Sequence, residues 1–192
     1  LEIIDNDNVS GPKSARTQTL TVRVPSLDEI LNEADQLQVQ SEAELEQTLQ
    51  EAEELKKALD EIDKELKKDE EKLSWEEKQK IENAIEKFHE LQDKVDKIND
   101  QLGDMKQNLQ ENHLLSKETM EKYMELQKLM DEMTSEDMKK AMERMQNMLK
   151  DMNRQMTQDE LQNLKFDEER FKKSIERTLN LLKRIQIEQK MD

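Results

Sequence analysis

The chain lacks cysteine and contains only two glycines, two prolines and 3% aromatic residues among its 192 residues. Without cysteine there is no disulfide, thiolate zinc site or cysteine nucleophile. No run of about 18 apolar residues occurs, so the sequence predicts that this segment does not itself cross a membrane. There is also no glycine-rich phosphate loop and no nucleophile elbow. These absences argue against the common classes of enzyme for this segment.

Charged residues make up 41% of the chain and hydrophobic residues 33%, a composition typical of coiled coils and long helices. The net charge of −16 argues against a nucleic acid as partner. Residues 27–73 carry 17 acidic and 6 basic residues, whereas residues 165–192 carry 6 acidic and 8 basic ones. A basic final helix could therefore lie along the acidic first helix or bind an acidic partner. A solvated face with mixed charges is the simpler interpretation.

Residues 1–25 differ in composition from the rest of the chain. Turn-forming residues lie between Asp5 and Pro12, and residues 17–24 alternate between polar and apolar side chains as in a half-buried strand. Residues 1–4 are a candidate for an earlier strand. Because two strands alone are marginally stable in water, we interpret residues 1–25 as the C-terminal strands of a truncated β domain.

Residues 26–113 are predicted to form an acidic, antiparallel coiled-coil hairpin. Ser26 and Glu29 make a capping box for the first helix, and Ser74 and Glu77 make a second one. The second box predicts a tight turn near residues 69–74, with an unbroken helix as the alternative. A heptad seam supports the pairing of the two helices. In the first helix this seam consists of Leu31, Ala34, Gln38, Ser41, Leu45, Thr48, Ala52, Leu55, Leu59, Ile62, Leu66 and Leu73.

Polar seam residues near the start of this helix (Gln38, Ser41 and Thr48) are expected to weaken its packing and to leave room for partner exchange. The lone tryptophan, Trp75, follows the second capping box. It is interpreted as a buried anchor of the hairpin tip, with an exposed docking residue as the alternative, since tryptophan is favoured at interface hot spots.

Residues 114–192 form a Met-rich helical segment with a basic final helix. Caps at Ser116, Ser135 and Thr157 predict helices over about 117–133, 135–154 and 158–190. Ten of the twelve methionines lie between residues 120 and 156.

Methionine is flexible and polarisable, so an apolar methionine stripe can serve as a deformable core or as a partner surface. We predict a partner interface formed by Met138, Met142, Met145, Met148, Leu149 and Met152. Substituting Met142, Met145 and Leu149 with glutamate is expected to abolish partner capture. The alternative is soft-metal handling, because methionine thioethers can bind Cu(I). No histidine or cysteine lies in the stretch to complete a stronger copper site.

No catalytic, cofactor-binding or metal-binding residues are predicted. The Asp5-Asn6-Asp7 start departs from the EF-hand pattern, so a β-turn is favoured over an irregular calcium site. His89 and His113 are isolated, and the carboxylates include no pair that sequence alone marks for acid–base catalysis. The chain is therefore predicted not to be an enzyme.

Four stretches of the chain resemble a bacterial envelope family known only as "domain of unknown function 4175". These stretches are DNDNVSGPKSARTQTLTVRVPSLDEI, LSWEEKQKIENAIEKFHELQDKV, LSKETMEKYMELQKLMDEM and ERTLNLLKRIQIEQKMD. The resemblance implies a large protein with N-terminal membrane helices, a periplasmic β-rich part and a helical C-terminal region. It makes residues 1–25 the end of an immunoglobulin-like domain and locates the chain on the periplasmic side of the inner membrane.

Together these features predict an all-α fold, in which a long antiparallel coiled-coil hairpin precedes shorter Met-rich helices. The predicted function is that of a structural or interaction module in a membrane-anchored bacterial envelope protein. Its partners are expected to be proteins, including further copies of itself, bound through helix–helix contacts. Contact with the membrane is expected only through parts that this chain does not include.

Overall fold

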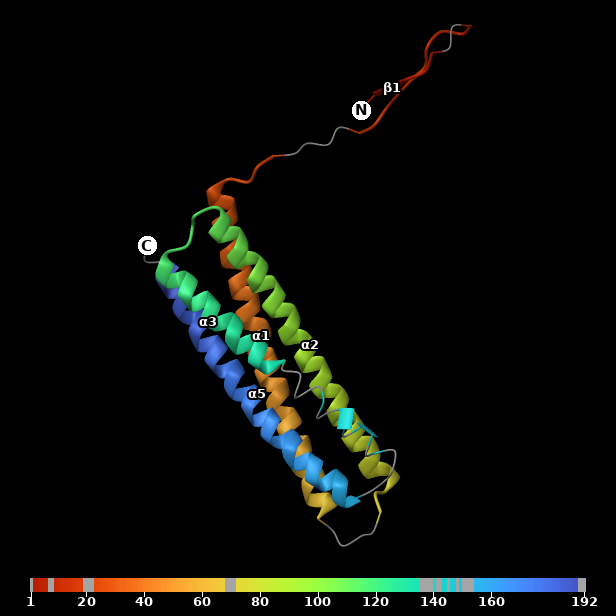
Figure 1. Ribbon diagram of the computed structural model, residues 1–192, viewed down its shortest axis with the longest axis vertical. Coiled ribbons are helices and arrows are strands. Elements are labelled where there is room, and N and C mark those ends of the chain that lie inside the picture. Colours follow the sequence, from red (N-terminus) through yellow and green to blue (C-terminus); the bar gives the residue numbers. More distant parts are fainter. Residues whose placement is uncertain are drawn as a thin grey trace.

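The computed structural model describes residues 2–6, 9–18, 23–67, 72–134, 140, 143–144, 146–147, 149 and 154–189. Over these residues the protein is all-α except for one small β-hairpin, as predicted. The described helices are α1 (Leu27–Leu66), α2 (Trp75–Glu111), α3 (Lys117–Met133) and α5 (Arg154–Gln189). They pack side by side into a rod, and the hairpin projects from one end of it (Figure 1).

The four helices form a bundle in which each helix has two close neighbours. α1 packs against α2 and α5, and α3 packs against the same two helices. α2 and α5 therefore lie on opposite corners of the bundle, and large side chains bridge the centre between them. The rings of Phe88 and Phe171 meet edge to face there, with centroids 5.4 Å apart and an interplanar angle of 83°.

α1 and α2 are separate helices, so the unbroken helix through Ser74 is excluded; residues 69–71 of the predicted turn lie outside the described part. α1 ends at Leu66, and α2 begins at Trp75 behind the predicted capping box. The Glu77 backbone N–H donates to Ser74 Oγ over 3.1 Å, and the Ser74 N–H donates to the Glu77 carboxylate over 2.8 Å. The capping box at Ser26 forms in the same way. α1 and α2 run antiparallel (Figure 1); their supercoiling stays a prediction.

The predicted seam of α1 is buried from Ala34 onward, but the prediction that Leu31 belongs to it is wrong. Leu31 is 42% exposed, and its neighbour Ile30 takes the inward position at 4%. The polar seam residues are buried as well: Gln38 donates from its side-chain nitrogen to the Leu182 carbonyl in α5 over 3.0 Å. Thr48 donates to the Glu44 carbonyl in its own helix. These polar groups therefore lie inside the bundle of this chain.

α3 has the predicted bounds, whereas α5 begins earlier than predicted. Ser116 caps α3 by accepting a hydrogen bond from the Thr119 N–H over 3.1 Å. α5 begins at Arg154, so Thr157 is not a cap but a fully buried residue of the helix. The local sequence allows a cap there, but inward packing favours continuation of the helix. Most of the helix predicted over 135–154 lies outside the described residues.

The N-terminal strands differ from the prediction in position. β1 (Glu2–Ile4) pairs antiparallel with β2 (Ser14–Arg16), and Glu2 lies opposite Arg16. Residues 17–18 and 23–24 of the predicted strand are not in a strand, and residues 19–22 lie outside the described part. The Lys13 N–H donates to the Asp5 carboxylate over 2.8 Å, which closes the loop between the strands. All strand residues are exposed.

Candidate interaction surface

Lysines on one side of α5 pair with acidic residues of α1. The ammonium groups of Lys165 and Lys172 lie 2.7 Å from Asp60 and 2.8 Å from Glu53, respectively. Lys183 lies 2.8 Å from Glu46. These hydrogen bonds raise the pKa of all three lysines. The basic final helix therefore lies along the acidic first helix, one of the two arrangements that the charge asymmetry allowed.

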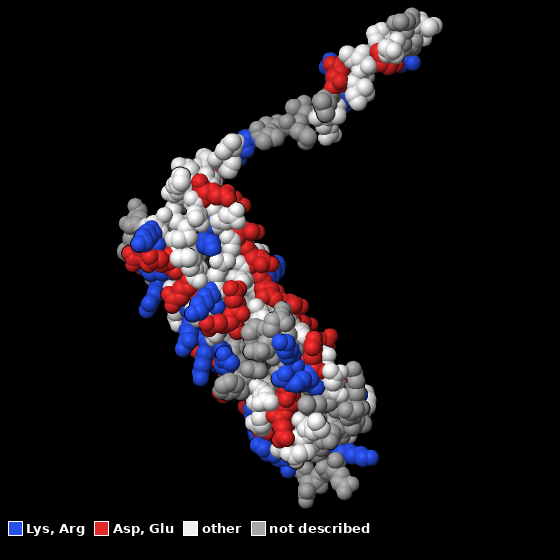
Figure 2. Space-filling model, in the orientation of Figure 1, with Lys and Arg blue, Asp and Glu red and all other residues white. Residues whose placement is uncertain are grey.

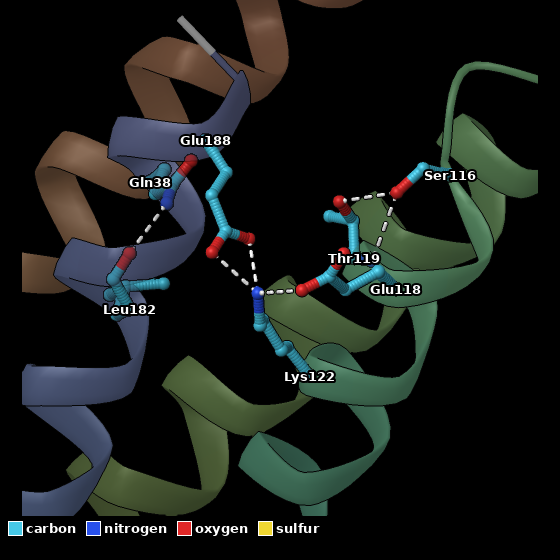
Figure 3. A network of polar contacts seen from close by, with 7 residues as sticks. All are labelled: Gln38, Ser116, Glu118, Thr119, Lys122, Leu182 and Glu188. Atoms are coloured by element: carbon cyan, nitrogen blue, oxygen red, sulfur yellow. Dashed lines mark hydrogen bonds and ion pairs between the residues drawn. The ribbon is translucent and has the colours of Figure 1, made fainter. Parts of the chain in front are cut away.

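Polar contacts also fasten α5 to α3 near the C-terminal end of α5 (Figure 3). The Lys122 ammonium reaches from α3 to the carboxylate of Glu188 on α5 and also bonds Glu118 over 3.2 Å. The hydrogen bond from Gln38 to the Leu182 carbonyl ties α1 to α5 in the same region. The Lys122–Glu188 contact links α3 to α5, and the Gln38 hydrogen bond links α1 to α5.

A groove of about 350 Å³ runs along the outer surface between α3 and α5. Leu129 and Leu181 supply its apolar part, while Arg177 and Arg184 lie on the α5 side. Glu125 lines the α3 side. Leu129 is half-buried and Leu181 is buried at 9% exposure, so the apolar part of the groove is small. The guanidinium groups beside it can bind carboxylates through paired N–H donors.

Three exposed basic residues on the outward face of α5 have no ion-pair partner among the described residues, and we call them the basic edge: Lys173, Arg177 and Arg184. Lysine and arginine side chains, drawn in blue, gather along the α5 side of the rod, on the left in Figure 2. In a chain of net charge −16, cations left without a carboxylate partner are available to an acidic ligand.

Sequence reasoning recognised the basic final helix but not its division into two faces. The signal was present, because Lys173, Arg177 and Arg184 recur at intervals of four and seven residues, which keeps them on one helical face. Lys172 and Lys183 recur on a neighbouring face. Which face would meet α1 depended on the rotation of α5 in the bundle.

The predicted methionine interface falls largely outside the described residues. This applies to Met138, Met142, Met145, Met148 and Met152. Leu149 is described, and it is buried at 1% exposure. The recognition role of the stripe stays a prediction, with its glutamate test confined to Met142 and Met145 because a charge at Leu149 would enter the core.

The structure also shows the surroundings of Trp75 and of two methionines outside the predicted interface. Trp75 is 71% exposed, so its interpretation as a buried anchor is wrong; Leu73, at 5%, fills that role at the hairpin tip. Met130 and Met133, a pair spaced to share one helical face, are fully buried in the core.

Over the described part of the chain, no group of three or more His, Asp or Glu side chains is arranged to hold a metal ion. None of the described helices has a stretch both long and apolar enough to span a bilayer.

No protein-family model, curated protein or solved structure matches the chain. The family resemblance carried by the four sequence stretches therefore stays a prediction.

Proposed function

We propose that this chain is a structural and interaction module that recognises an acidic helix of a protein partner. The groove between α3 and α5 is the proposed binding surface. The observation that carries this proposal is the presence of Arg177 and Arg184, both without a carboxylate partner among the described residues, beside Leu129 and Leu181. An amphipathic helix could place apolar side chains on the leucines and carboxylates over the arginines.

The two parts of the groove have different roles in this proposal. An exposed ion pair contributes only about 0.2–1 kcal/mol, so contact with the leucines has to supply much of the affinity. The arginines supply selectivity, because they attract carboxylates and repel basic helices. Glu125 lines the other wall, so a bound helix should turn its acidic face toward α5.

In its cellular setting, we propose that the module belongs to a membrane-anchored protein of the bacterial envelope and lies on the periplasmic side of the inner membrane. The four stretches that resemble the envelope family support this part of the proposal. Labelling of whole cells that express the intact protein, with an amine-reactive reagent that does not cross the inner membrane, would test it. We expect Lys57 and Lys64, both exposed, to be labelled while the inner membrane is intact.

Binding of a designed peptide tests the recognition mechanism. The probe is a helical peptide with a leucine stripe flanked by glutamates, and its twin carries lysines in place of the glutamates. We expect the acidic peptide to bind, and the double variant Arg177→Glu/Arg184→Glu to bind it about tenfold more weakly or worse, measured by fluorescence anisotropy.

The matched control is Lys57→Glu/Lys64→Glu, which makes the same change in net charge on exposed positions of α1. This control should bind the acidic peptide as the unmodified protein does. Equal loss in both double variants would mean that net charge, rather than the groove, governs binding. Failure of the acidic peptide to bind, or equal binding of its lysine twin, would reject the proposed function.

A further inference from the structure

The outward face of α2 is the electrostatic opposite of the basic edge. It carries five exposed carboxylates, which we call the acidic edge: Glu86, Glu90, Asp93, Asp100 and Asp104. One exposed cation, Lys97, lies among them on the same face, so the acidic edge has a net charge of about −4. None of the five forms an ion pair with another described residue. Red side chains follow this side of the rod, and blue side chains gather along the other side over α5 (Figure 2).

The two edges cannot neutralise each other within one molecule. α2 and α5 occupy opposite corners of the bundle, and their outward faces point away from each other. Each molecule therefore presents a row of carboxylates on one side and a row of cations on the other. A second copy offers each row its opposite.

The spacing of the charges also matches between the edges. Lys173, Arg177 and Arg184 are separated by four and seven residues, and Asp93, Asp100 and Asp104 by seven and four. An antiparallel pairing of α5 with α2 would thus oppose all three charges. Asp100, Asp104 and the exposed Glu111 repeat the intervals in the original order, which suits a parallel pairing. Asp100 and Asp104 belong to both matches.

We propose that the occupant of the basic edge is the acidic edge of a second copy of this chain, so that molecules associate laterally through α5 of one and α2 of the next. This inference rests on the proposed function, because it names the acidic helix that the α3–α5 surface recognises. The contact joins different surfaces of the two molecules, and it leaves one free edge on each. Such a head-to-tail contact extends into a row rather than stopping at a closed dimer.

The strength and salt dependence of the contact follow from its composition. The apolar residues of α2 from Ile81 to Leu109 are buried in their own bundle, so the acidic edge meets the basic edge through exposed ion pairs without apolar side chains on the groove leucines. Such pairs make a weak interface, and we expect a dissociation constant on the order of 0.1–1 mM. Two molecules of net charge −16 also repel each other at long range. At about 0.1 M salt the screening length is about 10 Å, which weakens this repulsion more than it weakens pairs in contact. At about 1 M salt, the contact itself should be lost.

Sedimentation velocity with complementary variants of the full chain tests the inference at about 0.1 M salt. One variant carries Lys173→Glu, Arg177→Glu and Arg184→Glu, and the other carries Asp100→Lys and Asp104→Lys. The unmodified protein should associate with increasing concentration, whereas each variant alone should remain monomeric. An equimolar mixture should associate again, because the intact acidic edge of the first variant meets the intact basic edge of the second.

The controls separate edge contact from general charge effects. Lys57→Glu/Lys64→Glu/Lys128→Glu changes net charge as much as the first variant but alters exposed residues elsewhere, so it should associate like the unmodified protein. Both complementary variants stay net negative, so opposite net charges cannot explain assembly of their mixture. Circular dichroism establishes that each variant is folded before comparison.

A monomer at every concentration up to about 1 mM, or association of the first variant at the unmodified level, would overturn the inference. If self-association is absent while the acidic peptide still binds at the groove, the second copy is the wrong occupant and the proposed function stands. If neither the peptide nor a second copy binds, both proposals fall.

Discussion

Burial changes the acid–base chemistry of two side chains inside the bundle. Glu168 is 1% exposed, and burial raises its pKa to about 7. One of its carboxylate oxygens has no hydrogen-bond partner among the described residues. Burial likewise raises the pKa of Tyr123 to about 12. Tyr123 stays neutral at neutral pH in the folded and the unfolded state, so of these two groups it is Glu168 that makes stability depend on pH near neutrality.

The sign of this dependence follows from proton uptake. The ordinary pKa of a glutamate is 4.5, and that of Glu168 in the folded protein is about 7. Between these two pH values Glu168 is protonated in the folded protein and ionised in the unfolded chain. The unfolded state therefore binds fewer protons, and the contribution of Glu168 to the free energy of unfolding falls as pH rises through this window. Above about pH 7 the full cost of the buried carboxylate is present.

We predict that Glu168→Gln stabilises the protein at pH 8 by on the order of 2 kcal/mol. The gain should shrink as pH is lowered toward 4.5, since glutamine resembles the protonated acid. Urea denaturation at several pH values measures the difference. Comparison with the unmodified protein cancels the titration of the other carboxylates, and a gain that does not vary with pH would contradict the assignment.

At the scale of elements, capping residues decide where the long helices begin. Ser26, Ser74 and Ser116 each accept a backbone N–H at the start of a helix. The cap at Ser74 matters for the architecture because α1 and α2 are both long helices of the same bundle. Without a break between them, the chain could not return along α1.

Ser74→Ala should reduce the free energy of unfolding by about 1 kcal/mol, since the Glu77 N–H loses its acceptor at the start of α2. Ser74→Asp provides the matched control, because an aspartate side chain can accept the same hydrogen bond. Thermal or urea denaturation of both variants measures the effect. Equal destabilisation by alanine and aspartate would show that the serine acts through something other than capping.

The helix boundaries that sequence reasoning predicted depend on such local signals. Ser116 accepts a hydrogen bond from the Thr119 N–H, three residues further along the chain. The start of α3 could therefore be predicted from a few neighbouring residues. Thr157 carries a similar local signal, yet the helix runs through it because its side chain is buried in the bundle. The exposure of Trp75 could not be predicted from its neighbours either, because segments far away in the sequence decide whether a side chain is buried.

At the scale of the whole molecule, ion pairs between α1 and α5 set how the last helix lies on the first. The contacts of Lys172 with Glu53 and of Lys183 with Glu46 join residues more than 100 positions apart. These side chains are partly exposed, so each pair contributes only about 0.2–1 kcal/mol. Their main effect is on orientation, because they favour the rotation of α5 that turns one row of its lysines toward the acidic residues of α1.

Zero-length carbodiimide cross-linking should therefore join Lys172 to Glu53 and Lys183 to Glu46 within single molecules. Mass spectrometry of the monomer fraction identifies the linked peptides. The link between Lys94 and Glu51 is the internal control, since it joins α1 to α2 of the hairpin. Detection of the control link without the α1–α5 links would contradict the described bundle, as would α1–α5 links confined to the associated fraction.

By itself, the sequence determined what depends on neighbours along the chain: the all-α class, the capped starts of three helices and the apolar seams. Only the tertiary structure decided how α5 is rotated. That rotation turns Lys165, Lys172 and Lys183 toward α1 and leaves the basic edge facing outward. The physical reason is that caps and periodicity arise from contacts within a few residues. The direction that a helix face takes is set by packing against segments far away in the chain.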